Sequence, residues 1–286
     1  MGSTYYEFTE VRPKVYRIHS PENVFMDLFI GEEKALLFDT GFGYDDLYLA
    51  IREKTELPLV IVNSHSHPDH SCGNFRFSED IHIHKLDMDN CRRFNSAIAR
   101  AKAVEGAKLM EDYSTHELRN ILPKDFDEKY YIGQGTGNLI PVKEGDVFAL
   151  GGITLEIYEF PGHTMGSIGL YYKEEKLLYF SDSINSFLWL FMPEGGNLNT
   201  YLASVYKARR IDFEGFFCGH SPLLGTRKTL EEFIECAENL DYDNGITYDI
   251  PIAKKSAARV CPRKGYGPFD FDKPGYCAIV ISPDKL

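Results

Sequence analysis

The sequence predicts a mixed α/β fold that contains many short strands. Short apolar segments separated by turn signals occupy residues 11–84, and similar segments resume at Leu139. From Lys85 to about Leu122, Gly becomes scarce and Ala, Arg, Lys, Glu and Met predominate, which favours helix. The chain has 286 residues, of which 43% are hydrophobic and 26% charged. It is therefore long enough to bury a sizeable core, with the composition of an ordinary globular protein.

Other elements follow from local composition. We expect one helix within the first strand-rich region, from Tyr44 to Lys54. Residues 229–242 should form an amphipathic helix whose apolar side contains Leu230, Phe233, Ile234 and Leu240. The last 40 residues are rich in Gly, Pro, Tyr and Asp and end in a strand-like segment, residues 278–281. They could cover one side of a pocket or extend a sheet.

A histidine-rich run directly follows the apolar segment 59–62. Residues 63–70 read Asn-Ser-His-Ser-His-Pro-Asp-His and so place His65, His67, Asp69 and His70 within six positions. In extended backbone, a His-x-His pair directs both rings to one side of the chain. Pro68 then breaks the extension, so that Asp69 and His70 can turn elsewhere. Because one ion would rarely take four ligands from so short a segment, the run could supply two neighbouring metal ions.

Further candidate ligands each follow a short strand-like segment. His163, Asp182 and His220 occupy such positions, as does Asp39 near the start of the chain. Side chains at strand ends converge on one rim of a sheet, where α/β folds usually place their sites. A second His-x-His pair, His82 and His84, has no nearby carboxylate, so we interpret it as the polar face of a strand.

Taken together, these blocks resemble the metallo-β-lactamase superfamily of binuclear metallohydrolases. The resemblance covers residues 39–220. It implies an α+β fold, a four-layer αββα sandwich, and we expect residues 1–286 to form a single domain. It also assigns His65, His67 and His163 to a first metal, and Asp69, His70 and His220 to a second. Asp182 would bridge the two ions, while Asp39 would orient the ligand loops without touching metal.

The resemblance also bears on two segments near the expected site. The family often carries an insertion between the positions of His70 and His163, and we expect a helical insertion around residues 86–140. It could form a partial lid or pack on the outer face without a role in binding. The continuous apolar run 187–192 begins close to Asp182 and could line a substrate pocket or the core.

The ligand set predicts metal-assisted hydrolysis of a small-molecule ester, thioester, lactone or amide. Two divalent ions, by default zinc with iron or manganese as alternatives, could share a bridging hydroxide. Asp69 would orient this nucleophile and pass its proton to the leaving group. Asp182 stands where β-lactamases of this superfamily carry Cys or Ser, so a thioesterase or lactonase is favoured. The basic residues expected of a glyoxalase II are not recognisable. The alternative is a persulfide dioxygenase that uses one iron.

Composition limits the remaining possibilities. A formal net charge of −12, without a long basic stretch, argues against a nuclease, since nucleic-acid binding relies on Lys and Arg. No stretch approaches the roughly 20 apolar residues that span a bilayer, and the first residues do not resemble a secretory signal. Six scattered cysteines suggest reduced thiols. We therefore expect a cytoplasmic enzyme that binds a small-molecule substrate, with no nucleic acid or membrane as partner.

Overall fold

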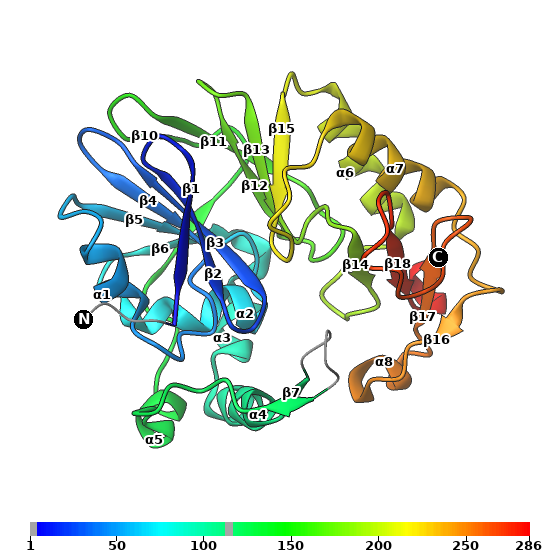
Figure 1. Ribbon diagram of the computed structural model, residues 1–286, viewed down its shortest axis with the longest axis horizontal. Helices are drawn as coiled ribbons and strands as arrows, with labels where there is room; N and C mark the ends of the chain where they lie inside the picture. Colours follow the sequence, from blue (N-terminus) through cyan, green and yellow to red (C-terminus); the bar gives the residue numbers. More distant parts are fainter. Residues whose placement is uncertain (1–4, 112–116) are drawn as a thin grey trace. The chain divides into compact units, whose positions relative to one another are not determined.

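The computed structural model describes residues 5–111 and 117–286, and its chain divides into two compact units (Figure 1). Unit 1 comprises Met1–Val142 and Phe148–Thr154, and unit 2 comprises Lys143–Val147 and Leu155–Leu286. Each unit has its own apolar core, and they are described separately below. The expectation of a single domain stays a prediction.

Unit 1 is organised around a seven-stranded sheet in the order β1-β2-β3-β4-β5-β6-β9. Its first four strands are antiparallel neighbours, whereas β4, β5, β6 and β9 run parallel. The strands are β1 (Glu7–Arg12), β2 (Val15–Ser20), β3 (Val24–Ile30), β4 (Ala35–Phe38), β5 (Leu59–Val62), β6 (Ile81–His84) and β9 (Leu139–Val142). In β6 the two isoleucines are buried and the two histidines half-buried, which confirms the strand predicted for the second His-x-His pair.

Helices connect these strands. They are α1 (Leu47–Arg52), α2 (Pro68–Ser71), η1 (Cys72–Arg76), η2 (Lys85–Asp87), α3 (Met88–Phe94), α4 (Ala97–Lys108) and α5 (Glu128–Ile132). The helix predicted within residues 44–54 is confirmed, and it begins where the Asp46 side chain accepts from Leu49 N–H. The predicted helical stretch was too long, because α4 ends at Lys108 and the short strands β7 (Met110–Glu111) and β8 (Leu118–Arg119) follow. Asn120 then accepts from Leu122 N–H in a local turn that competes with helix.

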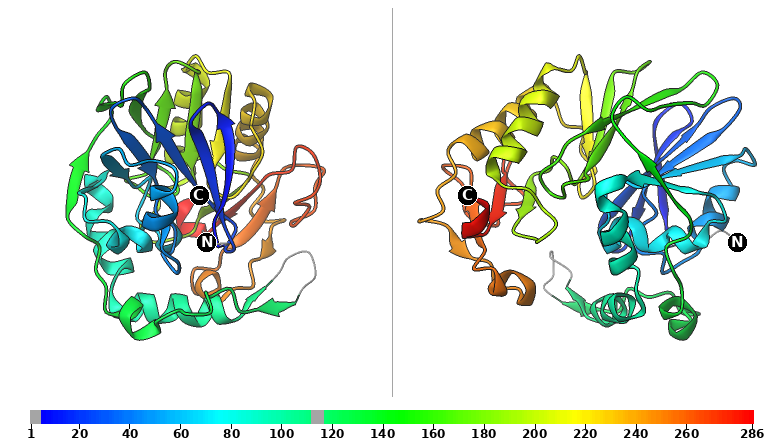
Figure 2. Two further views of the ribbon diagram at one scale, coloured as in Figure 1. Left: turned by 60° about the vertical axis from the view of Figure 1, so that its left-hand side comes forward. Right: turned by 180° about the vertical axis from the view of Figure 1, so that it is seen from behind.

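Unit 2 contains two sheets. The first has the order β10-β11-β12-β13-β15 and the second the order β14-β18-β17-β16. The strands are β10 (Val147–Ala149), β11 (Thr154–Glu159), β12 (Ile168–Tyr172), β13 (Leu177–Ser181), β14 (Phe187–Leu190), β15 (Gly215–Cys218), β16 (Ile246–Thr247), β17 (Arg259–Pro262) and β18 (Ala278–Ile281). The helices are α6 (Leu198–Arg210), α7 (Arg227–Glu238), α8 (Pro251–Lys255) and η3 (Pro283–Lys285). The two long helices, α6 and α7, lie side by side (Figure 2).

The C-terminal residues form strands of a sheet, which was one of the two predicted alternatives. The segment predicted at residues 278–281 is β18, and it pairs with β14 and β17. The helix predicted at residues 229–242 is α7, which ends four residues early because Asn239 caps it by donating to the Glu235 carbonyl. Leu240 nevertheless packs against the core with the predicted apolar side.

The continuous apolar run after Asp182 is explained by β14. Leu188 and Leu190 point to the core cluster that contains α6 and α7 residues, whereas Phe187 and Trp189 pack against a second cluster with Tyr248. The strand therefore alternates as strands do, but both of its faces contact apolar groups.

Two further expectations concern the chain as a whole. All six cysteines are buried and none forms a disulfide, in agreement with the prediction of reduced thiols. Within residues 5–111 and 117–286, no helix combines the length and the apolar character that crossing a bilayer requires.

Candidate metal centre

Parallel pairing in unit 1 brings Asp39 beside the histidine-rich run. Strands β4 and β5 are parallel with Phe38 opposite Val62, so both chains leave the sheet at one edge. Asp39 follows β4 directly, and Ser64 lies two residues beyond β5. The predicted convergence of strand ends is therefore found within this unit.

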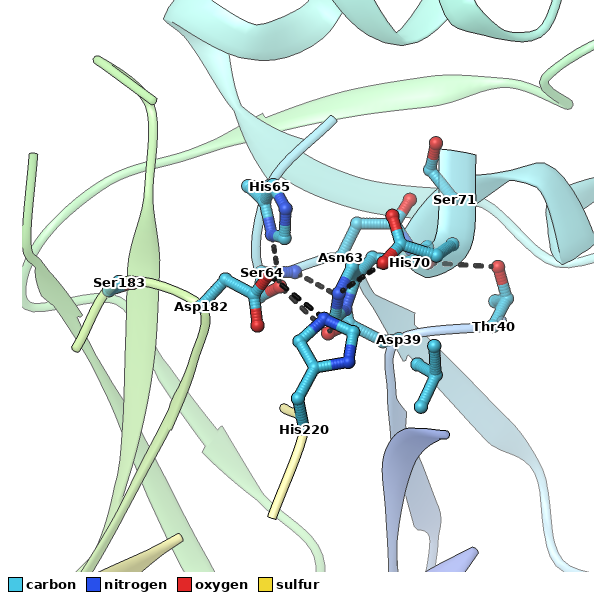
Figure 3. Close-up of polar contacts among 12 residues, drawn as sticks. Asp39, Thr40, Asn63, Ser64, His65, His70, Ser71, Asp182, Ser183 and His220 are labelled. Atoms are coloured by element: carbon cyan, nitrogen blue, oxygen red, sulfur yellow. Dashed lines mark hydrogen bonds and ion pairs between the residues drawn. The ribbon is translucent and has the colours of Figure 1, made fainter. Parts of the chain in front are cut away.

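Asp39 is the centre of a buried hydrogen-bond network (Figure 3). Its Oδ1 accepts from Ser64 N–H at 2.7 Å, and its Oδ2 accepts from the Ser64 hydroxyl at 2.7 Å. Oδ2 also lies 2.8 Å from His70 Nδ1. The residue is 1% exposed and has a φ of 68°, a left-handed conformation that is uncommon for non-glycine residues.

These contacts fix the tautomers of two histidines. A carboxylate oxygen can only accept, so His70 Nδ1 must carry the proton and its Nε2 carries the lone pair. The Ser64 hydroxyl gives its single proton to Asp39, so it accepts from His65 Nδ1, 2.9 Å away. The lone pair of His65 therefore also lies on Nε2.

The rest of the run turns as the sequence predicted. His67 has an extended backbone, with φ −62° and ψ 153°, and α2 starts at Pro68. The rings of His65 and His67 lie 4.8 Å apart between centroids. Asp69 Oδ2 lies 3.4 Å from His70 Nε2, so a carboxylate oxygen and an imidazole nitrogen adjoin each other here.

In unit 2 the other three candidate ligands meet at one edge of the first sheet. Strands β11 and β13 are both antiparallel to β12, and β15 is parallel to β13. The chain therefore leaves β11, β13 and β15 in the same direction, toward His163, Asp182 and His220 respectively. Asp182 Oδ2 lies 3.7 Å from His163 Nε2 and 3.1 Å from His220 Nε2. Figure 3 shows the Asp182 carboxylate and the His220 ring in this unit.

A backbone carbonyl fixes a third tautomer. His163 Nδ1 lies 3.1 Å from the Trp189 carbonyl oxygen, which can only accept. The proton of His163 therefore sits on Nδ1, and the Nε2 atom that faces Asp182 carries the lone pair. Three of the histidines predicted as ligands thus share one pattern, with Nδ1 donating to the protein and Nε2 left basic.

Several residues that hold this arrangement could not be recognised from the sequence. Besides Ser64 and the Trp189 carbonyl, the buried Asp87 accepts from Ser66 N–H at 2.8 Å and so ties the run to η2. The partners lie 21–26 positions apart, and no local pattern links them. An aspartate at a helix start, as Asp87 is, would have been the one usable hint.

A second carboxyl group lies near Asp69. Glu22 is 6% exposed, and its Oε1 accepts from the Tyr5 hydroxyl at 2.7 Å. Burial raises the pKa of Glu22 above its ordinary value, and the negative charge of Asp69 adds to the rise. Sequence reasoning missed Glu22, because an isolated glutamate before a strand is usually exposed.

Comparison with known proteins now decides the family. The family model of the metallo-beta-lactamase superfamily matches residues 23–220, which include every candidate ligand. This chain belongs to the metallo-beta-lactamase superfamily. Among the described residues, the His, Cys, Asp and Glu groups that could hold a metal ion consist of the seven predicted ligands, and His82 and His84 are not among them.

Relatives within the superfamily are distant. The human protein named acyl-coenzyme A thioesterase MBLAC2 is 27% identical over 186 residues, 61% of this chain and 62% of that protein. A protein of Hyphomonas neptunium named hydroxyacylglutathione hydrolase is 24% identical over 170 residues, 59% of this chain and 46% of the relative. These matches thus span less than two thirds of each relative.

A solved structure supports the fold. The metallo-beta-lactamase from Pontibacter korlensis matches with a TM-score of 0.56 and 20% identity, covering 82% of this chain and 99% of that one. The predicted α+β fold of the metallo-β-lactamase type is therefore confirmed. The role of each metallo-beta-lactamase ligand position in this chain stays a prediction, and the choice between a lid and outer-face packing for residues 86–140 stays open.

Proposed function

We propose that this protein is a binuclear metal-dependent hydrolase of small-molecule thioesters. The observation that carries the proposal is the Asp182 carboxylate, one oxygen of which adjoins Nε2 of both His163 and His220. A carboxylate so placed suits a bridge between two ions. The names of two relatives, a thioesterase and a hydrolase of an acylated thiol, favour thioesters over the esters, lactones and amides that the sequence left open.

The residues present fit divalent metal. We propose that His65, His67 and His163 bind one ion, that Asp69, His70 and His220 bind the second, and that Asp182 bridges both. Neutral imidazole and carboxylate ligands suit zinc, and the same set accepts iron or manganese. The Nδ1 contacts of His65, His70 and His163 support this assignment, because they leave Nε2 basic on each ring. Asp39 would orient the ligand loops without touching metal.

Bound ions of this kind act as Lewis acids and lower the pKa of a coordinated water to about 7. The chain itself would contribute in three ways. Asp69 would orient the attacking water and pass its proton to the leaving thiolate, so that water and thioester yield acid and thiol. Asp182 would fix the separation of the two ligand sets. Asp39 would keep His70 and Ser64 oriented, which limits reorganisation during turnover.

The first test combines metal content with thioester hydrolysis. Elemental analysis of protein expressed without added metal should give close to two ions per chain, and the protein should release thiol from S-acetyl-N-acetylcysteamine. Asp182→Ala should lose metal and most activity. His82→Ala, which alters the other His-x-His pair, should retain both. One iron per chain with oxygen uptake and no thiol release would instead favour the dioxygenase alternative.

The state of the cysteines bears on the cellular location. We propose a small-molecule substrate and a cytoplasmic location, supported by six buried cysteines that form no disulfide.

A further inference from the structure

A cavity in unit 1 adjoins Asp69. Its volume is about 350 Å³, within the range of about 300–1,000 Å³ typical of small-molecule pockets. Its walls come from the start of β3, from the segment after Asp39 and from α4. The lining residues used below are Glu22, Phe42, Tyr44, Asp69, Ala103 and Gly106.

The walls of this cavity are mostly apolar. The rings of Phe42 and Tyr44 are stacked, with centroids 5.1 Å apart and planes 6° from parallel, and both residues line the cavity. The Tyr44 hydroxyl donates to the Ala103 carbonyl at 2.8 Å, so this polar group is already engaged. Glu22 and Asp69 are the two acidic residues of the lining, and Glu22 is itself held by Tyr5.

Small residues of α4 also line the cavity. Ala103, Gly106 and Ala107 recur at helical spacing and face the cavity. A Cβ atom added to Gly106 would meet nothing within 4 Å, so the space beside it is open. The helix is firmly held, because the buried Arg100 donates to the Cys72 carbonyl at 2.8 Å and to the Gly135 carbonyl at 3.1 Å.

We propose that this cavity binds the acyl chain of the substrate and that the chain is apolar. The inference rests on the proposed function, since it needs the reacting carbonyl near Asp69. From there, an acyl chain would extend along Phe42, Tyr44 and the small residues of α4, which line the cavity. On this proposal, the helical stretch for which we left open a partial lid or outer-face packing would line the site. Each methylene that enters should raise kcat/KM about fourfold, from the free energy of burying one CH₂ group.

The test is a chain-length series with one constant leaving group. We would measure kcat/KM for S-acyl-N-acetylcysteamine thioesters from acetyl to decanoyl. The wild type should show a rise of about fourfold per methylene until the cavity is filled. Gly106→Leu should lower the decanoyl value at least tenfold and leave the acetyl value within twofold. Leucine also favours helix over glycine, so α4 should not suffer.

The matched control is Glu105→Leu, which adds the same side chain to an exposed position outside the cavity lining. It should leave the whole series unchanged. A flat series in the wild type, or equal losses for acetyl and decanoyl in Gly106→Leu, would overturn the acyl pocket while leaving the hydrolase intact.

Binding of decanamide by calorimetry separates the two proposals. If no thioester is cleaved, the proposed function fails, yet decanamide should still bind the wild type more tightly than Gly106→Leu. Equal binding to both proteins would overturn the pocket irrespective of activity.

Discussion

Asp39→Asn tests whether the protein sets the histidine tautomers. The substitution keeps the size of the side chain and removes its charge. In the variant, the oxygen of the new amide must take the place of Oδ1, because the Ser64 N–H group that lies 2.7 Å away can only donate a hydrogen bond. The new NH₂ group therefore faces His70 Nδ1 at 2.8 Å, where two donors would meet. His70 must then carry its proton on Nε2, the atom proposed to bind metal.

The magnitude follows from the role of such supporting groups. Loss of a hydrogen-bond partner behind a metal-binding histidine typically lowers metal affinity about 10–100-fold. That range corresponds to about 1.4–2.7 kcal/mol. We expect a loss near the upper end, because the ring must change tautomer as well as lose a partner.

The assay is competition for Zn²⁺ with a chromophoric chelator, together with ¹⁵N NMR of the His70 ring in the metal-free protein. Asp87→Asn is the matched control, since Asp87 is 1% exposed but accepts from the Ser66 backbone N–H, which an amide oxygen can replace. The zinc affinity of Asp87→Asn should change by less than about threefold, which corresponds to less than about 0.7 kcal/mol. Unchanged zinc affinity and an unchanged His70 tautomer in Asp39→Asn would refute the reasoning.

Three further predictions concern stability. Arg100→Met should destabilise the metal-free protein by about 3–5 kcal/mol in urea unfolding, because it breaks a buried network, whereas the exposed Arg92→Met should change it by less than about 0.5 kcal/mol. Glu22 has a raised pKa in the folded state, so its contribution to stability is full below about pH 4 and falls as pH rises. Glu22→Gln should therefore lose less stability than the wild type between pH 4 and 7, and parallel curves would contradict this. Chelation of metal should lower the melting temperature, and zinc at 100 times its Kd should restore about 2.7 kcal/mol; equal melting curves would argue against a native metal site.

Local sequence patterns predicted several of the elements and all of the candidate ligands. Strand patterns and turn residues located β5, β6 and β18, and the apolar spacing located α7. The ligand run 63–70 indicates metal binding by itself, because a His-x-His pair before a proline has few other roles. These features are local, so that neighbouring residues alone reveal them.

The contacts that hold these groups depend on the folded chain. The contact of Asp39 with His70 joins residues 31 positions apart and depends on the parallel pairing of β4 with β5. The carbonyl of Trp189 orients His163 from 26 positions away, and a carbonyl leaves no trace in residue type. Likewise, both faces of β14 are apolar because two core clusters cover them, which periodicity along one strand cannot show. Pairing register and burial depend on the whole chain, and for that reason tautomers, pKa shifts and the cavity beside Asp69 became visible only in the folded protein.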